Sequence, residues 1–149
     1  MPNLILLIKG DFFLKNLLKW GIWLLPFFYM VVIWILSSLP SNAVVELPDS
    51  SLDRMIKESL HLVEFAILYV LFVAALLTTG KFSKRLSILC AVAASLYGLL
   101  DEFHQSFVPY RSATVIDLVK DVTGVLVAFY FVQRGYRKHG FNRVMEYFK

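Results

Sequence analysis

The sequence predicts an all-α integral membrane protein, a four-helix bundle preceded by an N-terminal amphipathic helix at the membrane interface. Hydrophobic residues make up 58% of the 149 residues, and the mean hydropathy is +0.67. Soluble domains are only about 45–50% apolar. Long apolar runs are separated by short stretches of charged, Pro, Gly and Ser residues, as in multi-pass membrane proteins. We expect one domain, covering residues 1–149.

Four apolar segments are the expected membrane spans, at about residues 20–38, 59–79, 86–107 and 114–133. Tryptophans near the ends of the first segment are typical of the membrane interface. Residues 4–18 mix apolar and charged side chains at helical spacing, which favours a helix lying along the interface over one that crosses the bilayer. Residues 41–57, with their Pro, Ser and acidic residues, are expected to form a loop.

The positions of the basic residues predict an orientation. Most of the 15 Lys and Arg residues lie in the N-terminal arm, in the turn at 80–85 and in the tail after residue 133. Short basic loops stay cytoplasmic, so both termini are expected inside, in a bacterial inner or plasma membrane. The basic residues end apolar segments and form no single face, which favours membrane lipids over nucleic acid as partners. Cys90 is the one cysteine, which excludes an intrachain disulfide.

A cluster of polar residues lies where the third span ends and the fourth begins. Its members are Asp101, Glu102, His104, Gln105, Arg111, Asp117, Lys120 and Asp121. The second span opens with His61 and Glu64, which four spans would place on the same, extracytoplasmic side. Helical spacing aligns each set along one helix face. Because ionisable groups inside a span are costly unless they are paired or used, this layer is the predicted functional site.

The residues leave two interpretations open. In the first, the cluster is a structural interhelical network in which Arg111 bridges Asp117 or Asp101. In the second, it is an enzyme site at the outer leaflet: His61 or His104 and Glu102 act as base and acid, and Arg111 binds an anionic group of a lipid-linked substrate. A divalent metal held by His61, Glu64 and Asp101 is a variant of the second, although no tight metal motif is present and no cofactor is expected.

Two segments, KESLHLVEFAIL at 57–68 and SLYGLLDEFHQSFVPYRSATVIDLVKDVTG at 95–124, resemble the VanZ-like integral membrane proteins. The resemblance covers the second to fourth spans. It implies these signature positions: His61, Glu64, Asp101, Glu102, Gln105, Arg111, Asp117 and Asp121. One departure is Glu58, where the family often has a basic residue three positions before the His.

The VanZ-like family is named for a protein that confers resistance to the glycopeptide teicoplanin. The resemblance therefore implies a role on the bacterial cell envelope, linked to such resistance, but it supplies no mechanism. The rival expectation is a non-enzymatic membrane scaffold, or a partner of an envelope system, whose polar cluster is structural.

Overall fold

The computed structural model describes the chain except residues 1, 41–49, 110, 112, 113 and 149, and the side chains of residues 2–11, 50–58 and 61 are also left undescribed. All regular structure in the described part is helical. The five helices are α1 (Pro2–Ser37), α2 (Ser50–Leu77), α3 (Lys84–Gln105), α4 (Val115–Arg137) and α5 (Asn142–Tyr147).

The bounds of α1 and α2 differ from those predicted. The expected interfacial helix and first span form one continuous helix, α1, because no capping or helix-breaking pair separates residues 18 and 20. Pro26 is buried inside α1 without ending it. Helix α2 begins at Ser50, inside the stretch expected to be a loop, and the short α5 was not predicted.

Two of the described helices are long and apolar enough to cross a membrane: Phe12–Ser37 of α1, and α3. The apolar stretch of α2, Leu62–Leu77, is shorter. Helix α4 carries Asp117, Lys120 and Asp121 in its first two turns. Four spans therefore remain a prediction, while two apolar helices support a membrane protein.

Helices α3 and α4 both begin at a side-chain cap. The Ser83 hydroxyl accepts a hydrogen bond from the Leu86 amide at 3.3 Å, and the Thr114 hydroxyl accepts one from the Asp117 amide at 3.2 Å. Such caps satisfy amide groups that the first helical turn leaves unbonded. Gly80, with a φ of 67°, takes the left-handed conformation in the turn after α2.

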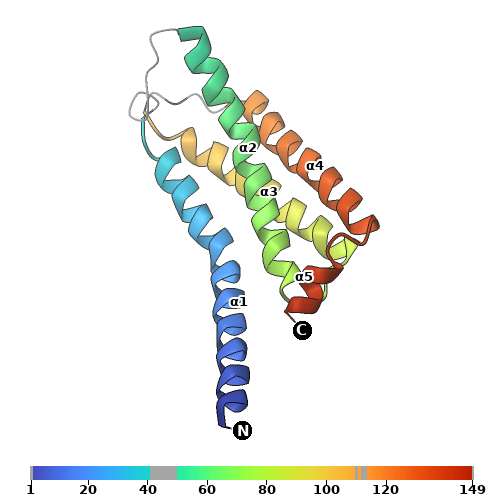
Figure 1. Cartoon of the computed structure of the whole chain (residues 1–149). Helices are drawn as coiled ribbons and strands as arrows, with labels where there is room; N and C mark the ends of the chain where they lie inside the picture. Colours follow the sequence, from blue (N-terminus) through green and yellow to red (C-terminus); the bar gives the residue numbers. More distant parts are fainter. Residues whose placement is uncertain (1, 41–49, 110, 112–113, 149) are drawn as a thin grey trace.

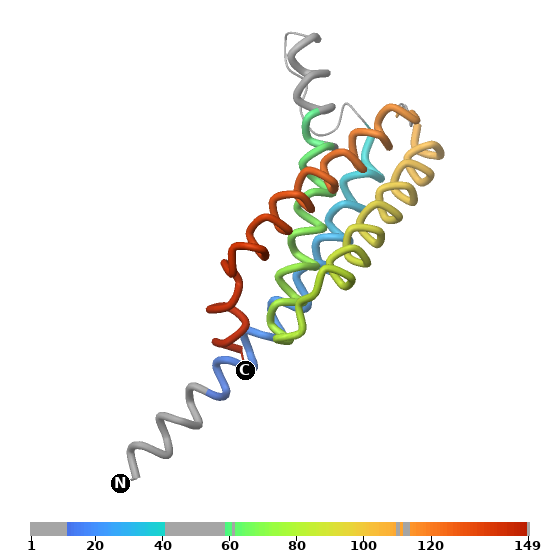
Figure 2. The backbone as a smooth tube through the Cα atoms, turned by 90° about the vertical axis from the view of Figure 1, so that its right-hand side faces the viewer, coloured from blue at the N-terminus to red at the C-terminus, as the bar shows by residue number. Residues whose placement is uncertain are grey.

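Helix α2 is the centre of the bundle and packs against α1, α3 and α4. Figure 1 shows α1 on one side of α2 and α4 on the other, and in Figure 2 α3 runs beside the second half of α1. The core is built on α2 side chains, among them Phe65, Leu68 and Tyr69. A Cβ at Gly124 of α4 would lie 1.8 Å from the Leu62 carbonyl oxygen, so α2 and α4 touch at backbone level.

The described surface is strongly apolar, and the interior holds buried acids beside its hydrophobic core. Large apolar side chains such as Phe28, Leu96, Phe103 and Leu126 are exposed, whereas several carboxylates are buried. A surface this apolar marks contact with a membrane or another protein. Buried acids inside such a bundle are functional-site candidates.

Candidate functional site

The candidate site lies at one end of the bundle, where α1 and α3 end and α4 begins. Its most buried acids are Asp101 and Asp121, with exposed fractions of 1% and 0%, and Glu102 at 6%. Leu100 and Phe103, beside them on α3, are exposed. The helical register thus turns the acids inward and the apolar side chains outward.

Gln105 joins the acids of α3 to Arg111. Its amide nitrogen donates to the Asp101 carboxylate at 2.6 Å, one helical turn earlier, and lies 3.3 Å from the Ser37 hydroxyl of α1. Its amide oxygen accepts from Arg111 Nη1 at 3.3 Å. A buried side chain with both ends engaged fixes its own rotamer and those of its partners. Gln105 therefore links Asp101 to Arg111 and fixes the positions of both side chains.

Arg111 holds the C-terminal end of α1. Its Nη2 donates to the Leu36 carbonyl at 2.7 Å, and its Nε donates to the Leu39 carbonyl at 3.0 Å. The last carbonyls of a helix have no partner within the helix, and cations are favoured there. Counting the bond to Gln105, the guanidinium donates three hydrogen bonds to described residues, out of the five N–H groups that it carries.

His104 also faces α1. Its ring stacks on Trp34 at a centroid distance of 3.9 Å and an interplanar angle of 21°, and its Nε2 lies 3.0 Å from the Ser38 hydroxyl. These contacts turn the ring toward α1 and set it apart from the salt-linked residues of α4. The predicted role of His104 as a catalytic base stays a prediction.

The first turn of α4 carries a second polar group. Lys120 Nζ donates to the Asp117 carboxylate at 3.0 Å, and the Thr114 hydroxyl donates to the other Asp117 oxygen at 2.6 Å. The backbone amide of Thr114 faces the Glu102 carboxylate of α3. Asp117 and Glu102 therefore flank the start of α4, where the helix dipole favours negative charge.

Asp121 lies deeper in the bundle, against Gly98 of α3. A Cβ at Gly98 would lie 3.4 Å from both Asp121 Cβ and Asp121 Oδ2. The missing side chain lets the acid sit against the α3 backbone. Asp121 interacts electrostatically with four other acids of the layer, Glu102, Asp101, Glu64 and Asp117. The structure thus brings together carboxylates from α2, α3 and α4, whose helical spacing had aligned them along one face of each helix.

Glu64 completes the layer from α2, and the predicted His61 side chain lies outside the described residues. Glu64 interacts electrostatically with Asp101 and Arg111. The described side chains contain no group of three or more His, Cys, Asp or Glu residues able to hold a metal ion. The predicted trio of His61, Glu64 and Asp101 includes an undescribed member, so that variant stays a prediction.

The end of α1 contributes a part of the site that the sequence did not single out. Ser37 and Ser38 contact Gln105 and His104, Trp34 stacks on His104, and two α1 carbonyls bind Arg111. The predicted topology already placed residues 37 and 38 in the same layer as the cluster. Every residue has a backbone carbonyl, however, so the residue types could not show which carbonyls bind Arg111.

The layer holds more acids than bases. Glu64, Asp101, Glu102, Asp117 and Asp121 stand against Arg111 and Lys120 among the described side chains. In a low-dielectric interior such an excess is costly unless protons or a bound cation offset it. The arrangement can therefore exchange protons with a ligand, or hold a polar head group beside Arg111.

Comparison with known proteins identifies the family. A sequence model of the family described as VanZ/LLP1 matches residues 17–134, from the middle of α1 to the last turns of α4. No curated protein and no solved structure gives a significant match. The matched range contains every residue of the polar layer described above, and the chain belongs to the VanZ/LLP1 family.

Proposed function

We propose that this protein acts at the outer leaflet of the bacterial inner membrane, on an anionic, lipid-borne substrate of the cell envelope. Membership of the VanZ/LLP1 family supports an envelope role with a link to glycopeptide resistance. The two apolar helices support a membrane location. The basic turn at 81–85 and the basic tail lie at the bundle end opposite the polar layer, which favours an outward-facing site.

The position of Arg111 carries this proposal. Arg111 lies beside the acidic layer, in the short connection between α3 and α4. A guanidinium carries five N–H donors in one plane, so it can bind a phosphate or carboxylate while it keeps other partners. The N-terminus of α4 begins three residues further on, and its amide groups also favour an anion.

The acids are arranged so that they need not repel such a group. Asp117 is neutralised by Lys120, and Asp101 accepts from Gln105 behind Arg111. Asp121 lies deeper in the bundle, against Gly98 of α3, and is fully buried. A phosphate at Arg111 would therefore meet cationic and amide donors first, with a carboxyl group such as Glu102 within the same layer for proton transfer.

A structural role for the cluster is the second candidate, and the α1 contacts favour it. Arg111 joins α1 to α3 through two carbonyls and Gln105. A protein that only scaffolds an envelope system would use the layer to fix α1 against the bundle. In that case the N–H groups left on Arg111 are bonded to water.

Binding of a lipid phosphate to three forms of Arg111 tests the proposal. The full chain is placed in nanodiscs, and binding of a fluorescent phosphatidic acid is compared with that of the uncharged diacylglycerol. Arg111→Ala should weaken phosphatidic acid binding by about tenfold or more, because a hydrogen bond to a charged group contributes about 1.5–3 kcal/mol. Arg111→Lys should fall between the two, since lysine keeps the charge and loses the planar fork.

Arg134→Ala is the matched control, since it removes the same charge from an exposed position on the last turn of α4. It should leave the binding unchanged. Equal phosphatidic acid binding by Arg111→Lys, Arg111→Ala and the parent would refute docking at Arg111. A lowered unfolding temperature in Arg111→Ala with that equal binding would assign the residue to the α1 attachment alone.

A further inference from the structure

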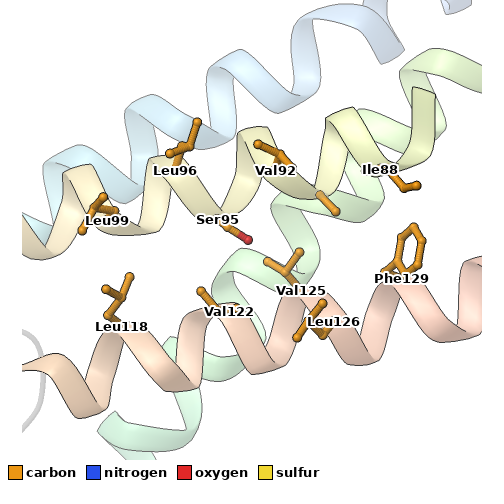
Figure 3. Close-up of a pocket in the computed structure, with 11 residues that line it drawn as sticks. Ile88, Val92, Ser95, Leu96, Leu99, Leu118, Val122, Val125, Leu126 and Phe129 are labelled. Atoms are coloured by element: carbon orange, nitrogen blue, oxygen red, sulfur yellow. The ribbon is translucent and has the colours of Figure 1, made fainter. Parts of the chain in front are cut away.

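An apolar groove runs between α3 and α4 on the outer surface of the bundle. It encloses about 400 Å³. Side chains of the two helices face each other across it (Figure 3), and the small residues Ala91 and Ser95 of α3 leave the space between them open. Helix α4 packs more extensively against α2 than against α3, because Gly124 brings it onto the α2 backbone. The groove is the space that this close α2–α4 contact leaves beside α3.

The walls of the groove suit a hydrocarbon chain. Apart from the Ser95 hydroxyl they are aliphatic or aromatic, and they include Ile88, Leu96, Val122 and Phe129. From Ile88 to Leu99 the groove is about 16 Å long at the helical rise of about 1.5 Å per residue. The space between the two helices can take one extended hydrocarbon chain along its length.

One end of the groove opens at the polar layer. Leu99 and Leu118 line that end. Leu118 follows Asp117 directly in α4, and Leu99 precedes Glu102 by less than one helical turn in α3. A molecule with its hydrocarbon chain in the groove would therefore carry its polar head to the start of α4, where Glu102 and the Asp117–Lys120 pair meet.

We infer that the α3–α4 groove holds one hydrocarbon chain of the lipid-borne substrate and thereby delivers its head group to the polar layer. This inference rests on the proposed function and adds the route by which the substrate is held. The groove supplies apolar contact area along the chain, and the polar layer supplies recognition of the head. Such a division of contacts would let the polar layer select lipid-borne over soluble anions.

Photocrosslinking in nanodiscs tests the groove. The probe is phosphatidic acid with a diazirine on one palmitoyl chain, and labelled positions are mapped by peptide mass spectrometry. Labelling at 88–99 and 118–129 should exceed labelling around Leu24 of α1, which is 62% exposed and lies outside the groove. Excess unlabelled phosphatidic acid should compete for the groove and spare the α1 signal.

Blocking variants give the matched comparison. Leu126, 58% exposed, lines the groove, whereas Leu100, 57% exposed, does not. Leu126→Trp should lower groove labelling by about tenfold, because displacing even two methylene groups of the chain has that effect on affinity. Leu100→Trp should leave it unchanged. Ser95→Leu, which fills the groove floor, should act like Leu126→Trp, and unfolding temperatures identify any variant that fails to fold.

The inference and the proposed function fail in different ways. Equal labelling of the groove and of the α1 face, or equal groove labelling in Leu126→Trp and Leu100→Trp, overturns the groove while leaving the Arg111 result untouched. Unchanged phosphatidic acid binding in the Arg111 variants, with strong groove labelling, refutes the proposed function and reduces the groove to a seat for ordinary membrane lipid.

Discussion

Replacing Gly124 by Ala should destabilise the protein more than the same change at Gly21 or Gly98. The added Cβ would lie 1.8 Å from the Leu62 carbonyl oxygen. Real Cβ atoms essentially never approach another atom this closely, so α2 and α4 would have to move apart at this crossing. The obstacle is backbone, which cannot rotate away as a flexible side chain can.

Two opposing effects set the expected magnitude. Alanine favours a helix over glycine by about 1 kcal/mol. Overpacking costs typically about 1–3 kcal/mol and rises when backbone must move. Separating α2 from α4 also loosens the core around Phe65 and Val125, which pack in the same cluster. With the overpacking cost at the upper end of its range, because backbone must move, and the helix-propensity gain of about 1 kcal/mol subtracted, the net expectation is a loss of about 2 kcal/mol or more in the free energy of unfolding.

Two other glycines give a graded control. At Gly21 a Cβ meets nothing within 4 Å, so Gly21→Ala should raise stability by up to about 1 kcal/mol. At Gly98 the nearest atoms are 3.4 Å away, so Gly98→Ala should be close to neutral for folding while it narrows the space around Asp121. Unfolding temperatures in detergent rank the three variants. A Gly124→Ala protein as stable as Gly21→Ala would refute the backbone contact between α2 and α4.

Two further predictions concern the rest of the bundle. Ser87→Ala should lower the free energy of unfolding by about 1–3 kcal/mol, because the buried Ser87 hydroxyl forms hydrogen bonds with both Tyr69 and Gln133 at 2.8 Å. Thermal unfolding measures this loss. Thr123→Ala is the control and should be neutral, because the exposed Thr123 hydroxyl bonds only its own helix. In a Cys90→Ser background, Pro109→Cys should react with an impermeant thiol reagent from outside intact cells and Lys81→Cys should not, both positions being exposed. The reverse labelling would contradict the outward-facing site.

The apolar runs of the sequence predicted where the long helices lie more accurately than where they begin and end. The apolar segments expected at 86–107 and 114–133 coincide with helices α3 and α4 to within a few residues, because long apolar runs mark these helices in the sequence, whereas their crossing of a membrane stays a prediction. The start of α2 was placed nine residues late, since Ser, Asp and Glu residues suit both a loop and the first turns of a helix. The predicted break before Trp20 is wrong, because a change from amphipathic to fully apolar sequence needs no change of backbone conformation.

The sequence could predict those parts of the candidate site that depend on the positions of side chains along a helix. Helical spacing indicated that Asp101, Gln105 and Asp121 turn inward, and all three are buried. The attachment of Arg111 was not predictable, because its main partners are the carbonyls of Leu36 and Leu39. Sequence reasoning had paired it with Asp117 or Asp101, whereas Asp117 binds Lys120 and Asp101 binds Gln105.

The α1 contacts also bear on how the structural and binding roles of Arg111 relate. Capping a helix end and binding an anion both require a cation with several donors, and guanidinium can serve two partners at once because its donors point in different directions. Three hydrogen bonds to α1 and Gln105 fix the position of the guanidinium before any ligand arrives. A preorganised side chain loses little conformational entropy on binding. The attachment of α1 is thus the device that would make Arg111 an effective anion site, and loosening α1 by Ser37→Ala or Trp34→Ala should weaken phosphatidic acid binding without touching the guanidinium.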